Sequence, residues 1–315
     1  MFKRNKKGFT IIEILVTLII VALLLSAAYF TYIKIFGSYK EESESIEQQL
    51  EKVVGLELLR LDLEHIGYGV AYDATDKIIE WNNTQHILTI RSTLNNTNQS
   101  TFGWILCADG SLINDERKDT SNNNIVFIDT LTGLYNSVVT SLTCPSIGVH
   151  IGFPIATNAN SCQVGSTNTC NTITYRKTNS NLPSHCNPNT FDLLRAVNGG
   201  SGNPLLHCIV DFVVTFDLDT DNDGTADSFG QNQPATDTNG NGQIDNSEIR
   251  AQLKRINFYA VMQEGGLNAD YVYPSSSINI DGITFNLPAN YQHYRWKVIK
   301  ISVRPTGMFG GLEFK

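Results

Sequence analysis

The chain has 315 residues, of which 41% are hydrophobic and 17% charged, and its formal net charge is −8 at pH 7. Four of the basic residues lie within residues 3–7, so a chain cut after them would be more acidic still. No basic stripe that could track phosphates follows, which argues against nucleic-acid binding as the main task. About 250 residues remain beyond an N-terminal anchor, enough for one large domain or two small ones, and we expect one core.

All six cysteines lie after the N-terminal apolar segment, and none falls in a Cys-X-X-Cys: Cys107, Cys144, Cys162, Cys170, Cys186 and Cys208. This spacing does not support zinc, c-type haem or thioredoxin chemistry. An even number of cysteines behind an export signal is typical of disulfides formed in an oxidising compartment, here up to three. Only the local pair Cys162–Cys170 can be suggested from the sequence. The alternative is buried free thiols that act as small hydrophobic side chains.

The first element is an apolar segment at residues 9–28 in which Glu13 is the only charged residue. A helix over it would cover about 30 Å, the thickness of a bilayer core, and the basic residues 3–7 predict a cytoplasmic N-terminus. A carboxylate in hydrocarbon costs about 2.5–3.5 kcal/mol, so a plain anchor does not explain Glu13. The ordinary alternatives are an uncut signal anchor and a signal peptide cleaved after the small residues 26–28.

The sequence KGFTIIE at residues 7–13 resembles the N-terminus of type IV prepilins and the related pseudopilins. The resemblance implies that residues 1–8 are a leader, cut after Gly8 by an inner-membrane prepilin peptidase that also methylates the amine of Phe9. It further implies that Glu13 pairs with the Phe9 amine of a neighbouring subunit in a filament. In a low-dielectric core this pair is worth more than in water. The alternative is a carboxylate that snorkels to the headgroups.

The helical pattern continues beyond the apolar segment, with apolar residues recurring at three- and four-residue spacing. We therefore expect one helix, made of a transmembrane or filament-core part (9–36) and an amphipathic part (37–67). The sequence GYG at residues 67–69 is a natural stop. Gly37 and Gly55 are possible points of bending, each about 1 kcal/mol less favourable than alanine in a helix.

Residues 68–315 are rich in Asn, Thr, Ser and Gly and lack long helical periods. Short β-branched or aromatic runs predict strands at 85–92, 102–107, 125–129, 137–143, 172–176, 208–216, 253–263 and 294–303. Strands that follow one long helix define the α+β class, here a pilin-like helix packed on a twisted antiparallel sheet. The Asn-rich tracts between them are predicted to be exposed loops. Residues 75–190 contain no motif that can be placed.

The second of two acidic loops at residues 217–248 is a candidate calcium site. The sequence DTNGNGQIDNSE at 237–248 fits every position of an EF-hand loop, with oxygen ligands at positions 1, 3, 5 and 9, glycine at 6, a backbone carbonyl at 7 and a bidentate glutamate at 12. The candidate ligands are Asp237, Asn239, Asn241, Gln243, Asp245 and Glu248. The alternative is a polar Asn-Gly turn without metal.

The first loop begins in the same way, with DTDNDGTAD at residues 219–227, but has Gly230 at the twelfth position. Its candidate ligands are Asp219, Asp221, Asp223, Thr225 and Asp227. Without the bidentate carboxylate we expect weaker binding, so one calcium ion is predicted and a second is left open. The predicted strand at 208–216 leads into the first loop, and only residues 247–252, at the end of the second loop, resemble a helical turn. Calcium is therefore expected to hold the loops in one shape and not to open a groove.

Three stretches resemble PilW-type minor pilins: the helix end LDLEHIGYG at 61–69, the strand VDF at 210–212 with the acidic loops after it, and an Arg-containing strand at 250–262. The resemblance implies a subunit that works by packing, in twitching motility or adhesion. Its partners would be other pilins and minor pilins, the prepilin peptidase and, before assembly, the inner membrane. There it would be a single-pass protein with its bulk in the periplasm, later moving to a cell-surface pilus. The nearest alternative is a J-type pseudopilin of type II secretion.

The alternative of a different class is an anchored periplasmic enzyme stabilised by calcium. The sequence contains no Gly-X-Ser-X-Gly, no His-Glu-X-X-His and no phosphate-binding glycine loop, so we expect no catalysis. Carboxylates are plentiful, which leaves a glycosidase-type pair open.

Overall fold

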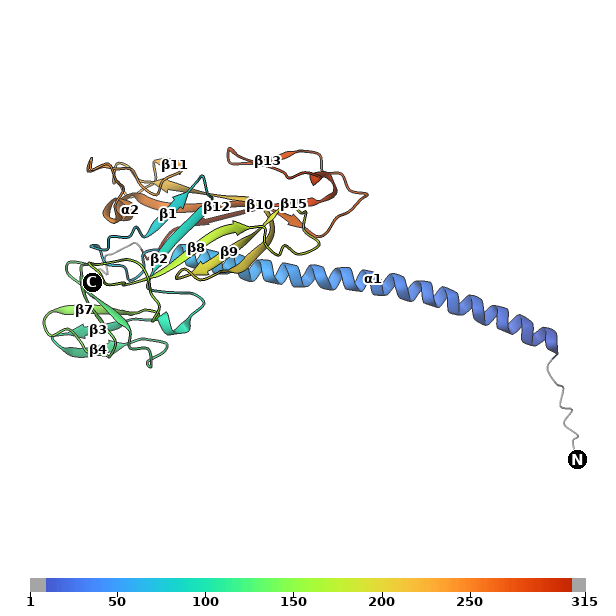
Figure 1. Cartoon of the computed structure of the whole chain (residues 1–315), viewed down its shortest axis with the longest axis horizontal. Helices are drawn as coiled ribbons and strands as arrows, with labels where there is room; N and C mark the ends of the chain where they lie inside the picture. Colours follow the sequence, from blue (N-terminus) through green and yellow to red (C-terminus); the bar gives the residue numbers. More distant parts are fainter. Residues whose placement is uncertain (1–9, 308–315) are drawn as a thin grey trace, which may run out of the picture. The chain divides into compact units, whose positions relative to one another are not determined.

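The structure is a computed structural model that describes the backbone of residues 10–307 and the side chains of residues 10–35 and 52–307. The chain divides into two units, residues 1–51 and 52–315, and each is described by itself. Figure 1 shows the elements in chain order.

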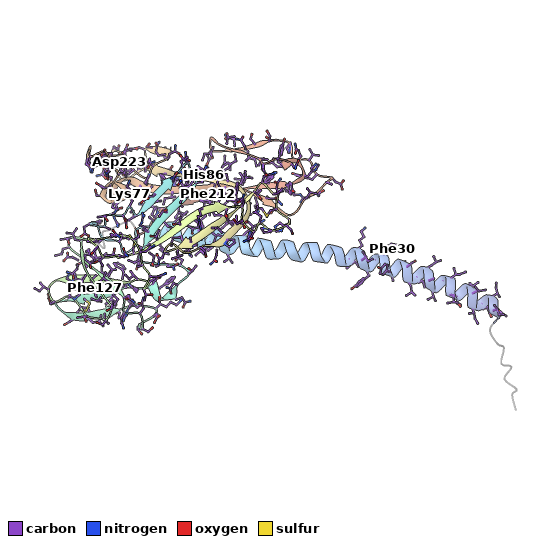
Figure 2. The ribbon with its side chains drawn as sticks, viewed as in Figure 1. Phe30, Lys77, His86, Phe127, Phe212 and Asp223 are labelled. Atoms are coloured by element: carbon purple, nitrogen blue, oxygen red, sulfur yellow. A yellow bond between two sulfur atoms is a disulfide. The ribbon has the colours of Figure 1, made fainter. Side chains whose placement is uncertain are left out.

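A single helix, α1 (Ile11–Glu64), holds 54 residues, so the predicted long helix is confirmed. Gly37 does not interrupt it. Every side chain from Thr10 to Ile35 is exposed, and Phe30 stands clear of the ribbon in Figure 2. By length and composition Ile11–Ile35 is able to cross a membrane. An exposed apolar surface of this extent is typical of membrane or protein contact.

Gly55 of α1 lies against Leu205 of β10 (Asn203–Leu218). A Cβ built on Gly55 would stand 2.4 Å from the carbonyl oxygen of Leu205, far inside van der Waals contact. The glycine was expected as a possible bend, but the structure shows an unbroken helix that needs hydrogen at this position. Its physical role is close packing of backbone on backbone.

We predict that Gly55→Ala destabilises the second unit, although alanine favours an isolated helix by about 1 kcal/mol. The added methyl group forces helix and strand apart, and overpacking of this kind costs about 1–3 kcal/mol. Denaturant unfolding of the full chain in detergent, followed by fluorescence of its three tryptophans, measures the change. The control Glu57→Ala, at an exposed site two residues on, should shift stability by less than about 0.5 kcal/mol. A more stable Gly55→Ala variant would contradict the packing role.

The second unit is built on an eight-stranded antiparallel sheet in the order β1-β2-β8-β9-β10-β12-β15, with β11 paired to β10. The strands other than β10 are β1 (Ile79–Asn82), β2 (Ile87–Ser92), β8 (Asn171–Thr178), β9 (Phe191–Val197), β11 (Ser228–Gln231), β12 (Leu253–Glu264) and β15 (Arg295–Val303). Leu59, Leu63 and Ile66 of α1 and the following turn are fully buried in the same hydrophobic cluster as Phe212 and Phe258 of the sheet. The helix therefore covers one face of the sheet, as an α+β pilin-like fold requires.

A hairpin of β13 (Ser277–Ile280) and β14 (Ile283–Asn286) belongs to a second cluster on the other face. Its Phe285 is buried together with Tyr259 of β12 and Trp296 of β15. The main sheet is thus covered on both faces over part of its length.

A separate five-stranded sheet has the order β4-β3-β7-β5-β6. Its strands are β3 (Ile105–Ala108), β4 (Ser111–Asp115), β5 (Ile125–Asp129), β6 (Tyr135–Val139) and β7 (Val149–Pro154). Figure 1 shows β3, β4 and β7 together, and Figure 2 marks Phe127 among them. Buried side chains of this sheet form two further clusters, so four clusters replace the single core that we expected.

All eight predicted strands are present, in β2, β3, β5, β6, β8, β10, β12 and β15; β5 has the predicted bounds and the others differ at one or both ends. The remaining strands were not predicted from the sequence. The three disulfides join Cys107 to Cys144, Cys162 to Cys170 and Cys186 to Cys208, and thus include the local pair suggested by the sequence.

Candidate functional site

The first candidate site is the start of α1, where Thr10 and Glu13 form a reciprocal cap. Glu13 Oε2 accepts hydrogen bonds from the backbone N–H of Thr10 (2.9 Å) and from its hydroxyl (3.0 Å). In return, the N–H of Glu13 donates to Thr10 Oγ1 at 3.3 Å. This is a capping box, which satisfies two donors that a helix start leaves unpaired. Gly8 and Phe9, the predicted cleavage and methylation positions, lie outside the described residues.

The sequence-based prediction gave Glu13 a role only in a filament and did not include the cap. The local pattern Thr-X-X-Glu before an apolar run was sufficient to find it. The carboxylate thus has polar partners before any subunit contact, and it is held at the first turn of the helix.

The second candidate site is the loop from Asp237 to Glu248, whose three carboxylates, unlike those of the first loop, do not have oxygens that all lie within 4.8 Å of one another. Asp237 accepts hydrogen bonds from the N–H groups of Gly240 and Gly242, both at 2.7 Å. Gly242, at the sixth position, has φ +80°, the sharp turn that an EF-hand loop needs there. Asn239 and Asn241 each accept from the N–H two residues on.

The end of this loop is fixed by a second capping box at the start of α2 (Asn246–Gln252). Asp245 is the N-cap, and its Oδ1 accepts from the N–H groups of Ser247 and Glu248, both at 3.0 Å. Glu248 Oε2 accepts from the N–H of Asp245 at 3.0 Å, and Oε1 accepts from the N–H of Thr238 at 2.6 Å. The twelfth-position carboxylate is therefore folded back over the first residues of the loop.

Hydrogen bonds hold Glu248 in its ionised form. Burial raises the pKa of its carboxyl group, but the N–H groups of Asp245, Thr238 and Asn239 outweigh this effect, so the pKa lies below its ordinary value. A deprotonated carboxylate is the form that calcium requires.

The first acidic loop brings three of its predicted ligands together. One carboxylate oxygen from each of Asp219, Asp221 and Asp227 lies within 4.8 Å of the others. The N–H of Asp223 lowers the pKa of Asp221, but desolvation and the charges of Asp223 and Asp227 outweigh it, so this pKa is raised. Figure 2 marks Asp223 in this loop, and the structure places Gly230, the twelfth residue, in β11. The loop is crowded with negative charge and has no twelfth-position carboxylate.

A buried ion pair that the sequence did not predict fixes α1 to the main sheet. Asp62 of α1 is 2% exposed, and Arg195 of β9 donates to its carboxylate from Nε at 2.5 Å and from Nη2 at 3.1 Å. The hydroxyl of Tyr175 in β8 and the amide of Asn96 (2.8 Å) also donate to it. Burial and the charge of Asp62 raise the pKa of Tyr175 well above its ordinary value, so the phenol stays a donor.

Arg250 lies in α2, because the cap at Asp245 begins a helix that runs to Gln252. This confirms the helical turn predicted at 247–252 and corrects the strand start at Arg250 that the PilW resemblance implied. Nη2 of Arg250 donates to the carbonyl of Val70 at 2.7 Å, and its guanidinium lies 5.0 Å from the ring centre of Tyr72. Burial lowers its pKa. The arginine thus connects the acidic loops to the segment just after α1.

An apolar N-terminal helix followed by antiparallel sheets is a pilin-like arrangement, and it is consistent with membrane anchoring. Residues 3–29 match the family model described as the prokaryotic N-terminal methylation motif, which supports a type IV pilin or pseudopilin. The motif implies processing by prepilin peptidase and assembly with other pilins. It suggests a structural protein, not an enzyme. Comparison with curated proteins and with solved structures gave no match.

Proposed function

We propose that this chain is a minor pilin of the PilW type, incorporated into a type IV pilus near its tip. There it helps to prime assembly with other minor pilins and thereby serves motility or adhesion. The observation that carries the proposal is the methylation motif at 3–29, followed by a helix whose apolar side chains are exposed from Ile11 to Ile35. The proposed work is packing and not catalysis.

The proposed mechanism starts at residues 9–13. Cleavage after Gly8 gives Phe9 a free, cationic amine, and the Glu13 carboxylate of a neighbouring subunit is its counter-charge. In a filament core this attraction is far stronger than in water, and it fixes the axial register of the helices. The apolar helices then bury one another, while the β domain faces outward.

The PilW assignment is supported by the order of elements after the helix. Strand β10 contains Val210-Asp211-Phe212 and runs directly into the acidic loops, which are followed by α2 and β12. A J-type pseudopilin of type II secretion is the second candidate, because the methylation motif is common to pilins and pseudopilins. A deletion strain separates the two: loss of surface pili supports the first, and loss of secretion with normal pili supports the second.

The test of processing is the mass of the N-terminal peptide of the protein recovered from membranes. We expect a peptide that begins at N-methylated Phe9. A peptide that begins at Tyr29, or an uncut chain, would leave Glu13 without an amine partner and would refute the filament role.

Calcium binding at 237–248 is part of the proposal. The residue types suit the ion: Asp237 and Glu248 offer carboxylates, Asn239 and Asn241 offer amide oxygens, and Gly242 makes the turn that an EF-hand loop needs at its sixth position. Calcium would neutralise this acidic segment and hold it against α2.

Calcium at 100 times its dissociation constant should stabilise the fold by about 2.7 kcal/mol. For a domain of this size that corresponds to a rise in melting temperature of about 5–10 °C over the protein with chelator. Tryptophan fluorescence of the full chain in detergent measures both states. In the control Glu248→Gln, glutamine can still form the capping box but offers no carboxylate, so the calcium effect should vanish. Equal melting temperatures with calcium and with chelator would refute calcium ordering.

A further inference from the structure

The two acidic loops differ in the positive charge that the chain itself provides. We infer that Lys254 takes the place of a metal ion in the loop 219–230, so that this loop does not bind calcium and the chain holds one ion, at 237–248. The count of one rests on the calcium site proposed above. The inference that the loop 219–230 binds no metal does not depend on that site.

Lys254 is bound at the first ligand position of the loop. Its Nζ lies 2.9 Å from Oδ2 of Asp219 and 3.1 Å from the carbonyl oxygen of Ala251. The lysine side chain is 18% exposed and the Asp219 side chain is fully buried. A buried carboxylate needs a counter-charge, and the ammonium group supplies it.

The backbone holds the lysine in this position. Lys254 is the second residue of β12, directly after α2. The N–H of Asp219 donates to the carbonyl of Gln252 at 2.8 Å, so the start of the loop is bound to the residues that precede the lysine. The contact between Lys254 and Asp219 therefore follows from the pairing of the end of β10 with the start of β12, where Leu218 lies opposite Leu253.

The carboxylates of this loop also accept backbone hydrogen bonds, as those of the loop 237–248 do, so the loops differ in the lysine and in the twelfth residue. Asp219 also accepts from the N–H groups of Asp223 (3.2 Å) and Gly224 (2.8 Å). Both oxygens of Asp227 accept from the N–H and the hydroxyl of Thr220, at 2.9–3.2 Å. At the twelfth position Gly230 has no side chain to offer, and its N–H donates to Asp217.

The loop 237–248 differs from the loop 219–230 at its first and twelfth positions. Asp237, at the same first position, is exposed, and its two oxygens accept from the backbone N–H groups of Gly240 and Gly242. Its twelfth residue, Glu248, has a carboxylate in place. The three clustered carboxylates of the first loop point to a cation, and Lys254 is the cation that the chain places there.

The experiment counts calcium ions by native mass spectrometry of the full chain in detergent. Glu248→Gln removes the second site, so any ion left reports on the first loop. We expect no ion on Glu248→Gln and one ion on Glu248→Gln/Lys254→Met. The matched control Glu248→Gln/Lys297→Met, at an exposed lysine of β15, should bind none. Calorimetric titration should show an affinity at least tenfold higher for the Lys254→Met double variant than for Glu248→Gln alone.

Two results would overturn the inference: an ion on Glu248→Gln that Asp221→Asn removes, or no ion gained when Lys254 is neutralised. Glu248→Gln/Lys254→Gln provides a second neutral variant if the methionine variant does not fold. Glu248→Gln/Lys254→Arg keeps the cation and should bind no ion. These comparisons decide the role of Lys254 even if the wild-type chain binds no calcium at 237–248.

Discussion

Glu13→Val is expected to remove the protein from filaments while leaving it processed and in the membrane. The substitution keeps the apolar surface of α1 but deletes the proposed counter-charge of the Phe9 amine. Because an unpaired charge in a low-dielectric core is costly, the variant subunit should not dock. We expect at least a tenfold lower fraction of the protein in sheared filaments than in the wild type, measured by immunoblot against the membrane fraction.

The capping box makes a sharper version of this experiment possible. Glu13→Gln can still accept a hydrogen bond from the N–H of Thr10, since glutamine also serves at this position of a capping box. Because glutamine has no charge, Glu13→Gln should be nearly as depleted from filaments as Glu13→Val. Thr10→Val removes the cap and leaves the carboxylate, at a cost of about 1 kcal/mol in helix stability, and should still assemble. Wild-type incorporation of Glu13→Gln would show that the residue serves the helix start and not the filament.

Asp62→Ala is expected to destabilise the second unit by about 3–5 kcal/mol, the usual cost of removing one partner of a buried ion pair. Arg195, which is 6% exposed, would be left without its carboxylate, and the hydroxyl of Tyr175 would lose its acceptor. Tryptophan fluorescence during denaturant unfolding measures the loss. Glu57→Ala, which removes an exposed carboxylate of the same helix, is the control.

Asp62→Asn should destabilise the second unit nearly as much as Asp62→Ala does. Arg195, Asn96 and Tyr175 all point donors at this position, and an amide would present a donor of its own to them. The double variant Asp62→Leu/Arg195→Met should recover part of the loss, because an apolar pair leaves no buried charge. If Asp62→Ala unfolded at the wild-type denaturant concentration, the ion pair would not be what fixes α1 to the sheet.

Local patterns predicted the elements whose signals are strong. The length of α1 follows from unbroken helical spacing, and the runs at 208–216 and 253–263 correspond to the two long neighbouring strands β10 and β12. By contrast, β7 carries Gly152 and Pro154, residues that usually mark a loop. The structure explains the glycine, because a Cβ there would meet Phe127 at 2.7 Å. Close packing across a sheet has no local sequence signal.

The candidate sites divide in the same way. The ligand pattern at 237–248 could be recognised because its residues are consecutive. The pattern of the Thr10 and Glu13 cap is equally local, although the cap was not predicted. The pair of Asp62 and Arg195 joins residues 133 positions apart, so no local pattern predicts the partner. One hint was present: a carboxylate between Leu59, Leu63 and Ile66, on the face of the helix that is otherwise apolar.

The disulfides connect the cysteines strictly in order, first with second, third with fourth and fifth with sixth. In the proposed orientation the chain leaves the membrane from its N-terminal end, so each cysteine emerges after its predecessor. If each disulfide forms as soon as its second cysteine is exported, Cys144 meets Cys107 before any other thiol is outside, and each later pair closes before the next begins. Of the 15 pairings that six cysteines allow, vectorial export combined with a simple oxidant selects the native one. Folding of this domain should therefore need an oxidase but no disulfide isomerase.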